Sequence, residues 1–145
     1  MLFNRITGVS NPFESFVAIP GNYDDVNSAF GDLDNDGDFD MFLTKYAGNV
    51  EYWENTGSAT APVLTQRTGA ANPMNGLVHD GKCPKIAIGD MDNDLDLDLW
   101  IGGNDGTVQY FKNTGNPASP VFERMTGGNN PLEGISFFEK ANPSL

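Results

Sequence analysis

Short runs in which apolar residues alternate with polar ones cover most of the chain, and glycine, asparagine and proline separate these runs. A period of two predicts β-strands. In the second half of the chain we expect strands at 85–88, 97–101, 107–111 and 120–125. The Asn-Asp-Gly sequence at 104–106 predicts a hairpin turn, because Asn and Gly adopt positive φ at little cost. The sequence shows no helical period with caps, so the pattern predicts an all-β fold.

This pattern occurs twice, at a distance of 58 residues along the chain. The segment 50–57 (Val-Glu-Tyr-Trp-Glu-Asn-Thr-Gly) corresponds without a gap to 108–115 (Val-Gln-Tyr-Phe-Lys-Asn-Thr-Gly). Near the N-terminus, 3–8 similarly corresponds to 122–127. A period of this length indicates a propeller, a solenoid or another array. Four antiparallel strands in each unit predict one propeller blade per unit.

The chain holds about two and a half of these units, which predicts an incomplete β-propeller. We assign 1–27 to the last strand of a preceding blade and its connector, 28–84 to a first blade, 85–134 to a second blade, and 135–145 to the lead-in of a next blade. Two blades alone would leave apolar faces and strand edges open. The expected partners are therefore further copies of the chain or the remainder of a longer propeller.

Two acidic runs carry the candidate chemistry. Each run has five aspartates on alternate residues: Asp32, Asp34, Asp36, Asp38 and Asp40 in the first, and Asp90, Asp92, Asp94, Asp96 and Asp98 in the second. On an extended strand the five side chains would share one face and repel one another. In a loop the same oxygens converge, and a hard dication such as Ca²⁺, which takes about six to eight oxygen ligands, would neutralise them. The sequence thus predicts two Ca²⁺ sites.

Charge and composition restrict the partners. The chain has 8 basic against 20 acidic residues and a net charge of −12. Without a basic patch, nucleic acid is not an expected partner, and the charge also disfavours an anionic membrane surface. No apolar run approaches the ~18 residues of a membrane span, so we expect no membrane insertion. Cys83, the single cysteine, is expected to be a small buried apolar side chain rather than a nucleophile assisted by His79.

The segments 30–40 (Phe-Gly-Asp-Leu-Asp-Asn-Asp-Gly-Asp-Phe-Asp) and 88–98 (Ile-Gly-Asp-Met-Asp-Asn-Asp-Leu-Asp-Leu-Asp) resemble FG-GAP repeats, also called VCBS or integrin-α N-terminal-like repeats. The resemblance implies that each unit is a propeller blade with a Ca²⁺-binding loop between its first two strands. It implies side-chain ligands at Asp32, Asp34, Asp36 and Asp40 in the first loop and at Asp90, Asp92, Asp94 and Asp98 in the second, with the main-chain carbonyls of Asp38 and Asp96 as further ligands.

The second loop departs from the pattern of this family at one position, where Leu95 replaces the glycine found at Gly37. Glycine at this position supplies a backbone with positive φ, which costs other residues about 1 kcal/mol or more. We therefore expect either a weaker second site or a slightly different turn.

The resemblance implies a non-enzymatic, calcium-binding module for adhesion or protein interaction, located outside the cell or at the cell surface. An extracellular protein or a glycan is the expected ligand. One alternative is a lectin-like accessory module of a secreted protein, in which an aromatic residue among Tyr52, Trp53, Tyr110 and Phe111 stacks on sugar. Another is a structural repeat of an extracellular filament or surface coat.

Three other readings of the acidic runs were considered. An EF-hand is excluded, because its loop needs Glu at position 12, where this chain has Leu43 and Ile101, and its loop is flanked by helices. Two solvated acidic turns without metal remain open. A glycosidase that uses a pair of carboxylates also remains open, although each run duplicates the other and no aspartate is distinguished as the acid.

Overall fold

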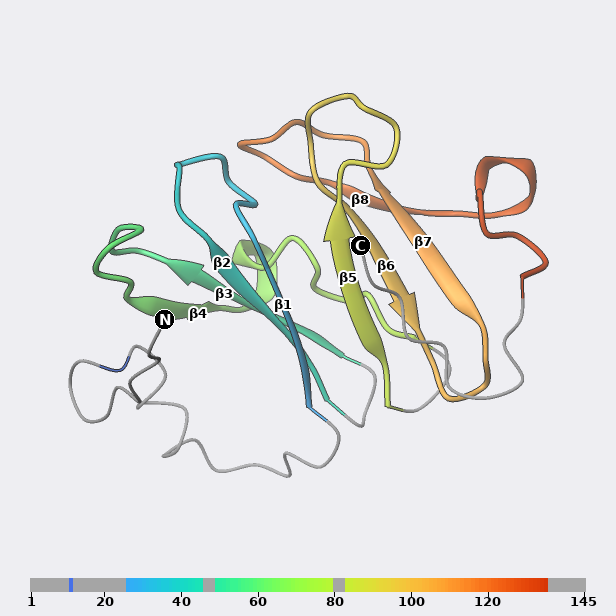
Figure 1. Ribbon diagram of the computed structural model, residues 1–145, viewed down its shortest axis with the longest axis horizontal. Coiled ribbons are helices and arrows are strands. Elements are labelled where there is room, and N and C mark those ends of the chain that lie inside the picture. Colours follow the sequence, from blue (N-terminus) through green and yellow to red (C-terminus); the bar gives the residue numbers. More distant parts are fainter. Residues whose placement is uncertain (1–10, 12–25, 46–48, 80–82, 136–145) are drawn as a thin grey trace, which may run out of the picture.

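The computed structural model describes residue 11 and residues 26–45, 49–79 and 83–135 of the chain. These residues form two four-stranded antiparallel sheets with almost no helix (Figure 1). The strands are β1 (Asn27–Gly31), β2 (Asp40–Thr44), β3 (Val50–Asn55) and β4 (Leu64–Arg67) in the first sheet, and β5 (Lys85–Gly89), β6 (Asp98–Gly102), β7 (Val108–Asn113) and β8 (Phe122–Met125) in the second. The predicted all-β class is confirmed. The strand predicted at 3–7 and nearly all of the lead-in at 135–145 lie outside the described residues.

Each sheet is a simple meander, with strand order β1-β2-β3-β4 or β5-β6-β7-β8. Every strand of the second sheet begins 58 residues after its counterpart, as β1 at Asn27 and β5 at Lys85 illustrate. The predicted turn at 104–106 joins β6 to β7, where Gly103 N donates to Thr107 O at 3.1 Å. A single turn of 3₁₀ helix follows the last strand of each sheet, η3 (Gly69–Ala71) after β4 and η4 (Gly127–Asn129) after β8.

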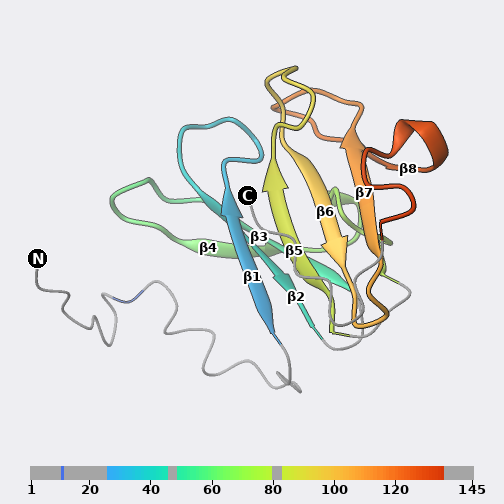
Figure 2. The same ribbon diagram turned by 45° about the vertical axis from the view of Figure 1, so that its right-hand side comes forward.

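The main hydrophobic core lies between the two sheets, with β1 beside β5 in both views (Figures 1 and 2). It combines side chains from both sheets and from the segments that join the strands. Its buried members are Leu33, Phe42, Val50, Tyr52, Met74, Ile86, Leu99, Ile101 and Phe111. Within the part of the chain that the structure describes, no helix is long and apolar enough to cross a membrane.

The two sheets contribute opposite faces to this core. The first sheet turns Phe42 towards the second sheet, whereas the second sheet turns Leu99 towards the first. The repeat maps Phe42 onto Trp100 and Leu99 onto Met41, and neither of these residues belongs to the main core. Met41 instead joins a smaller cluster on the other face of its sheet. The sheets are therefore stacked front to back, as successive members of a series would be.

Candidate metal centre

The acidic runs form the loops that join the first two strands of each sheet. The first loop follows Gly31, which pairs with Asp40 at the start of β2. Asp32 curls this loop, because its Oδ1 accepts a hydrogen bond from Asp36 N and its Oδ2 one from Gly37 N, both at 3.0 Å. A further bond runs from Asp38 N to Asp36 Oδ1 at 3.1 Å. The segment is thus a turn held by its own carboxylates, as the repulsion argument predicted, rather than an extended strand.

The second loop has the same internal hydrogen bonds. Asp90 accepts from Asp94 N at 3.2 Å and from Leu95 N at 3.0 Å. Leu95 has a φ of +75°, close to the +96° of Gly37, so the turn is retained although the glycine is not. This finding decides between the two structural expectations for the second loop: the turn keeps its shape, and the leucine carries a left-handed backbone.

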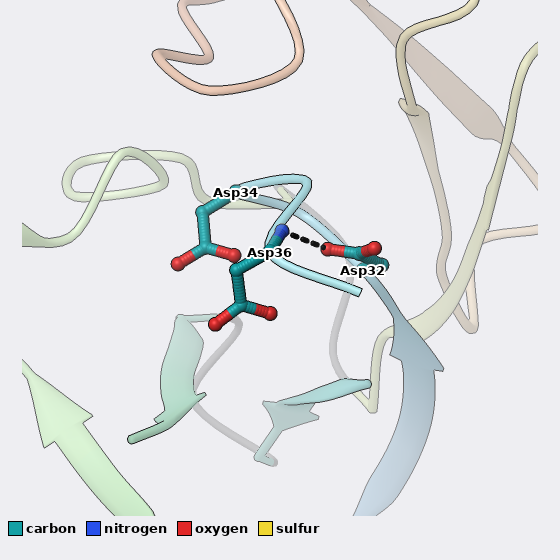
Figure 3. Close-up of side chains that lie close together, drawn as sticks. All are labelled: Asp32, Asp34 and Asp36. Carbon is teal, nitrogen blue, oxygen red and sulfur yellow. Dashed lines mark hydrogen bonds between the residues drawn. The ribbon is translucent and has the colours of Figure 1, made fainter. Parts of the chain in front are cut away.

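Three carboxylates converge in each loop. In the first loop, Asp32, Asp34 and Asp36 each place a carboxylate oxygen so that the three oxygens lie within 4.8 Å of one another (Figure 3). In the second loop, Asp90 and Asp92 converge with Asp94 in the same way. Burial, followed by the nearby charge of Asp36, raises the pKa of Asp34 above its ordinary value. Each triad can hold a metal ion.

The carboxylates next to the triads support this interpretation. Asp38 and Asp96 are each only 7 % exposed, and the Oδ1 atom of each has no hydrogen-bond partner among the described residues. Burial and the charge of Asp94 raise the pKa of Asp96 to about 6. A buried carboxylate oxygen without a donor is costly unless a cation or water satisfies it. Because all of these groups are oxygen donors, the loops fit a hard dication such as Ca²⁺ rather than a metal that prefers nitrogen or sulfur.

The last aspartate of each run has another role in the structure. Asp40 does not join the triad but accepts three hydrogen bonds, from Leu33 N at 3.1 Å, Tyr52 Oη at 2.9 Å and Asn55 N at 2.8 Å. Burial raises its pKa to about 6, and these hydrogen bonds partly oppose the shift. Asp40 therefore fastens the loop to β3.

Asp98 makes the equivalent contacts in the second sheet, with Met91 N at 3.3 Å, Tyr110 Oη at 2.6 Å and Asn113 N at 2.8 Å. Of the predicted ligands, the structure thus brings three side chains together in each loop and places the fourth beside them as an anchor.

The network continues into the hairpin between the third and fourth strands. Asn55 Oδ1 accepts from Gly57 N at 3.1 Å and from Val63 N at 2.9 Å. Asn113 does the same for Gly115 and Val121, at 3.0 and 2.9 Å. The sequence interpretation did not assign these asparagines, or the tyrosines that bind Asp40 and Asp98, to the acidic loops. The available signal was their identity in both units at the 58-residue offset.

The two loops differ in one charged neighbour. Glu54 follows β3 residue Trp53 in the first unit, and its carboxylate binds Arg67 through two hydrogen bonds of 2.7 and 2.5 Å. This contact lowers the pKa of Glu54, and the charge of Glu54 in turn contributes to the raised pKa of Asp34. The corresponding residue of the second unit is Lys112, whose ammonium bridges two carboxylates of the triad, Asp92 and Asp94.

The aromatic residues considered for sugar stacking are buried. Their exposed fractions range from 3 % for Tyr52 to 7 % for Trp53. Rings with so little exposure do not offer an open face to a sugar. Cys83 is also buried, as expected for a small apolar side chain, and His79 is buried with its Nε2 3.4 Å from Thr107 Oγ1.

Comparison with family models, with curated proteins and with solved structures finds no match to this chain.

Proposed function

We propose that this chain is a non-enzymatic, Ca²⁺-binding module of the FG-GAP type. The observation that carries the proposal is the duplication of the loop geometry. Two loops at equivalent places in the two sheets each hold three convergent carboxylates and a buried aspartate whose Oδ1 has no hydrogen-bond partner among the described residues. A general acidic coating would not reproduce the same hydrogen bonds twice.

Calcium is the preferred metal for two reasons. The loops offer oxygen ligands alone, in an irregular turn, and Ca²⁺ tolerates irregular geometry with about six to eight ligands. Mg²⁺ demands a near-ideal octahedron and gives up its water reluctantly. Loops of this kind suit the millimolar Ca²⁺ found outside cells, so we propose that the module works in the extracellular space or at the cell surface.

The proposed architecture is a β-propeller in which each sheet is one blade. Support comes from the four-stranded meanders, the equal offset of all strand pairs and the front-to-back stacking of the sheets. Blades of a propeller stack in this sense around an axis. The proposed role in adhesion or protein interaction rests on the family resemblance, since a fold alone does not determine function.

Exposed apolar residues support stacking on further units. Phe39 is 68 % exposed, whereas its counterpart Leu97 packs against the main core. Conversely, Met91 is 41 % exposed, whereas its counterpart Leu33 is 2 % exposed within that core. The residues left exposed are thus the counterparts of residues that the internal contact covers. We propose that another copy of this chain, or a further unit of a longer protein, covers them in the same way, which also keeps open a structural role in a filament or coat.

Calcium titration tests the proposed function. Isothermal calorimetry and native mass spectrometry of the wild-type chain should show two Ca²⁺ ions per chain at millimolar calcium. Asp36→Asn and Asp94→Asn should each remove one ion, because they delete a triad carboxylate from separate loops.

The matched control is Asp105→Asn, which removes an aspartate outside both loops. Asp105 Oδ1 caps the turn by accepting from Thr107 N at 3.0 Å, and an amide oxygen keeps that bond. This variant should bind both ions. Fewer than one Ca²⁺ per wild-type chain would contradict the proposal.

A further inference from the structure

The second acidic loop already holds a cation, the ammonium group of Lys112. This residue lies on β7, and its Nζ donates to Asp92 Oδ2 and, at 3.1 Å, to Asp94 Oδ2. Both acceptors belong to the triad whose oxygens converge within 4.8 Å. The lysine therefore marks the point in this loop where positive charge is stabilised.

The same oxygens cannot serve the ammonium and a dication at once. Lys donates up to three hydrogen bonds and carries a unit charge on a flexible stem. Ca²⁺ needs the triad oxygens as direct ligands and repels a neighbouring ammonium. The buried Asp96 Oδ1, which has no hydrogen-bond partner among the described residues, remains for the metal after the lysine has moved away. Loading of this loop thus requires displacement of the side chain.

The first loop has a different arrangement at the aligned position. Glu54 stands there, and its carboxylate is held by Arg67. The side chain at the aligned position therefore carries a negative charge in the first unit and a positive charge in the second. Loop geometry does not explain a difference between the sites, because the internal hydrogen bonds of both loops are alike.

We propose that Lys112 is a built-in competitor for metal at the second loop, so that Ca²⁺ fills the first loop at lower concentration and enters the second only by displacing this ammonium. The inference rests on the proposed function, because it assumes that the loops bind Ca²⁺. It assigns the two sites different roles. The second loop is neutralised in part without metal, whereas the first loop depends on metal, and the chain responds to calcium in two steps.

Calorimetry on a single-site background tests this competition. In an Asp36→Asn chain, where only the second loop is expected to bind, Lys112→Met keeps the apolar stem and removes the charge. A unit charge near a dication at about 4 Å in water is worth about 2 kcal/mol, so Ca²⁺ affinity should rise on the order of tenfold. Lys112→Glu, which introduces the residue of the first unit, should raise it further. Lys45→Met, which removes a lysine paired with Glu51 at the opposite end of β2 from the loop, should leave it unchanged.

Amine labelling of the wild-type chain provides a test that needs no variant to fold. Mild acetylation followed by mass spectrometry should show faster modification of Lys112 after Ca²⁺ is added to chelator-treated protein, with Lys85 on β5 as the internal reference. An unchanged Lys112 rate in protein with calcium bound at both loops would overturn the inference.

The two proposals fail in distinguishable ways. If both loops bind Ca²⁺ and Lys112→Met does not tighten the second loop, the competitor role is wrong while the proposed function stands. If neither the wild-type chain nor any lysine variant binds Ca²⁺, both proposals are wrong.

Discussion

At the residue scale, the aspartates of one run perform two separate tasks. Asp36 contributes an oxygen to the triad, whereas Asp40 accepts three hydrogen bonds from groups that burial removes from water. A ligand carboxylate matters when metal is present. An anchor carboxylate matters in every state of the protein, because a buried donor that loses its acceptor destabilises the fold by about 1–3 kcal/mol.

Asp40→Asn should therefore destabilise the chain without calcium. Its amide can still accept from Asn55 N, but an NH₂ group would face Leu33 N, which then lacks an acceptor. We expect a loss of about 1–3 kcal/mol in the free energy of unfolding, measured by urea denaturation in EDTA. Asp36→Asn is the control, since its remaining oxygen still accepts from Asp38 N. If both variants lose equal stability in EDTA, the division between anchor and ligand is wrong.

Leu95 makes a second prediction at this scale. The residue is 80 % exposed and has a φ of +75°, so it gains little packing and bears the strain of a left-handed backbone. Leu95→Gly should relieve that strain, which is about 1–2 kcal/mol, against the larger chain entropy of glycine, about 0.5–1 kcal/mol. A small net rise in the free energy of unfolding is expected by urea denaturation.

The reciprocal change, Gly37→Leu, should lower it, because Gly37 has the corresponding positive φ and no atom within 4 Å of an added Cβ. Opposite signs for the pair would support backbone strain as the cause, and equal signs would contradict it.

At the scale of the element, each β3–β4 or β7–β8 hairpin is closed by a main-chain contact that excludes any side chain. A Cβ added at Gly115 would lie 2.3 Å from Ser119 O and 2.9 Å from Val121 N. Both atoms belong to the backbone, so the hairpin itself would have to open. Because Asn113 links this hairpin to Asp98, a distortion here also reaches the acidic loop.

Gly115→Ala should thus destabilise the chain by about 1–3 kcal/mol through overpacking, as measured by thermal or urea unfolding. Gly128→Ala is the matched control, since an added Cβ there meets nothing within 4 Å. The first variant should also weaken Ca²⁺ binding at the second loop more than at the first. Equal stability of the two alanine variants would show that the hairpin adapts without cost.

At the scale of the whole molecule, metal and fold are linked by mass action. A ligand that binds the folded chain alone adds about 2.7 kcal/mol per site when its concentration is a hundred times its Kd. Removal of calcium with EDTA should lower the melting temperature, as followed by circular dichroism. A chain with both Asp36→Asn and Asp94→Asn should show a much smaller EDTA effect. An identical melting temperature of the wild-type chain with and without calcium would contradict a structural role for the metal.

The exposed apolar residues predict association in a head-to-tail sense. Phe39→Gln and Met91→Gln alter the two different faces, and each should shift sedimentation towards smaller species because burial of apolar area drives stacking. A mixture of the two variants should form dimers, since each retains the face that the other lacks. Val121→Gln is the control, because Val121 and its counterpart Val63 are both exposed, at 53 % and 56 %. A wild-type chain that stays monomeric at tens of micromolar would contradict this prediction.

Local features of the fold followed from the sequence. Alternation, turn residues and the 58-residue repeat predicted an all-β chain with two sets of four strands, and the structure has both. Repulsion among alternating aspartates predicted that 32–40 and 90–98 curl into loops. The reason is physical: strand period, turn conformation and short-range charge repulsion act between residues that are close along the chain.

The sequence did not predict which side chains the fold would bring to the loops from a distance. Asp40 meets Tyr52 and Asn55, and Asp92 meets Lys112, through pairing of strands that lie 12 to 20 residues apart. Nor did alternation specify which face of each sheet would enter the main core, because both faces of β2 and β6 are apolar. Only packing of one sheet on the other selected Phe42 from the first and Leu99 from the second. The tertiary structure therefore decided which acids act as anchors and which loop already holds a cation.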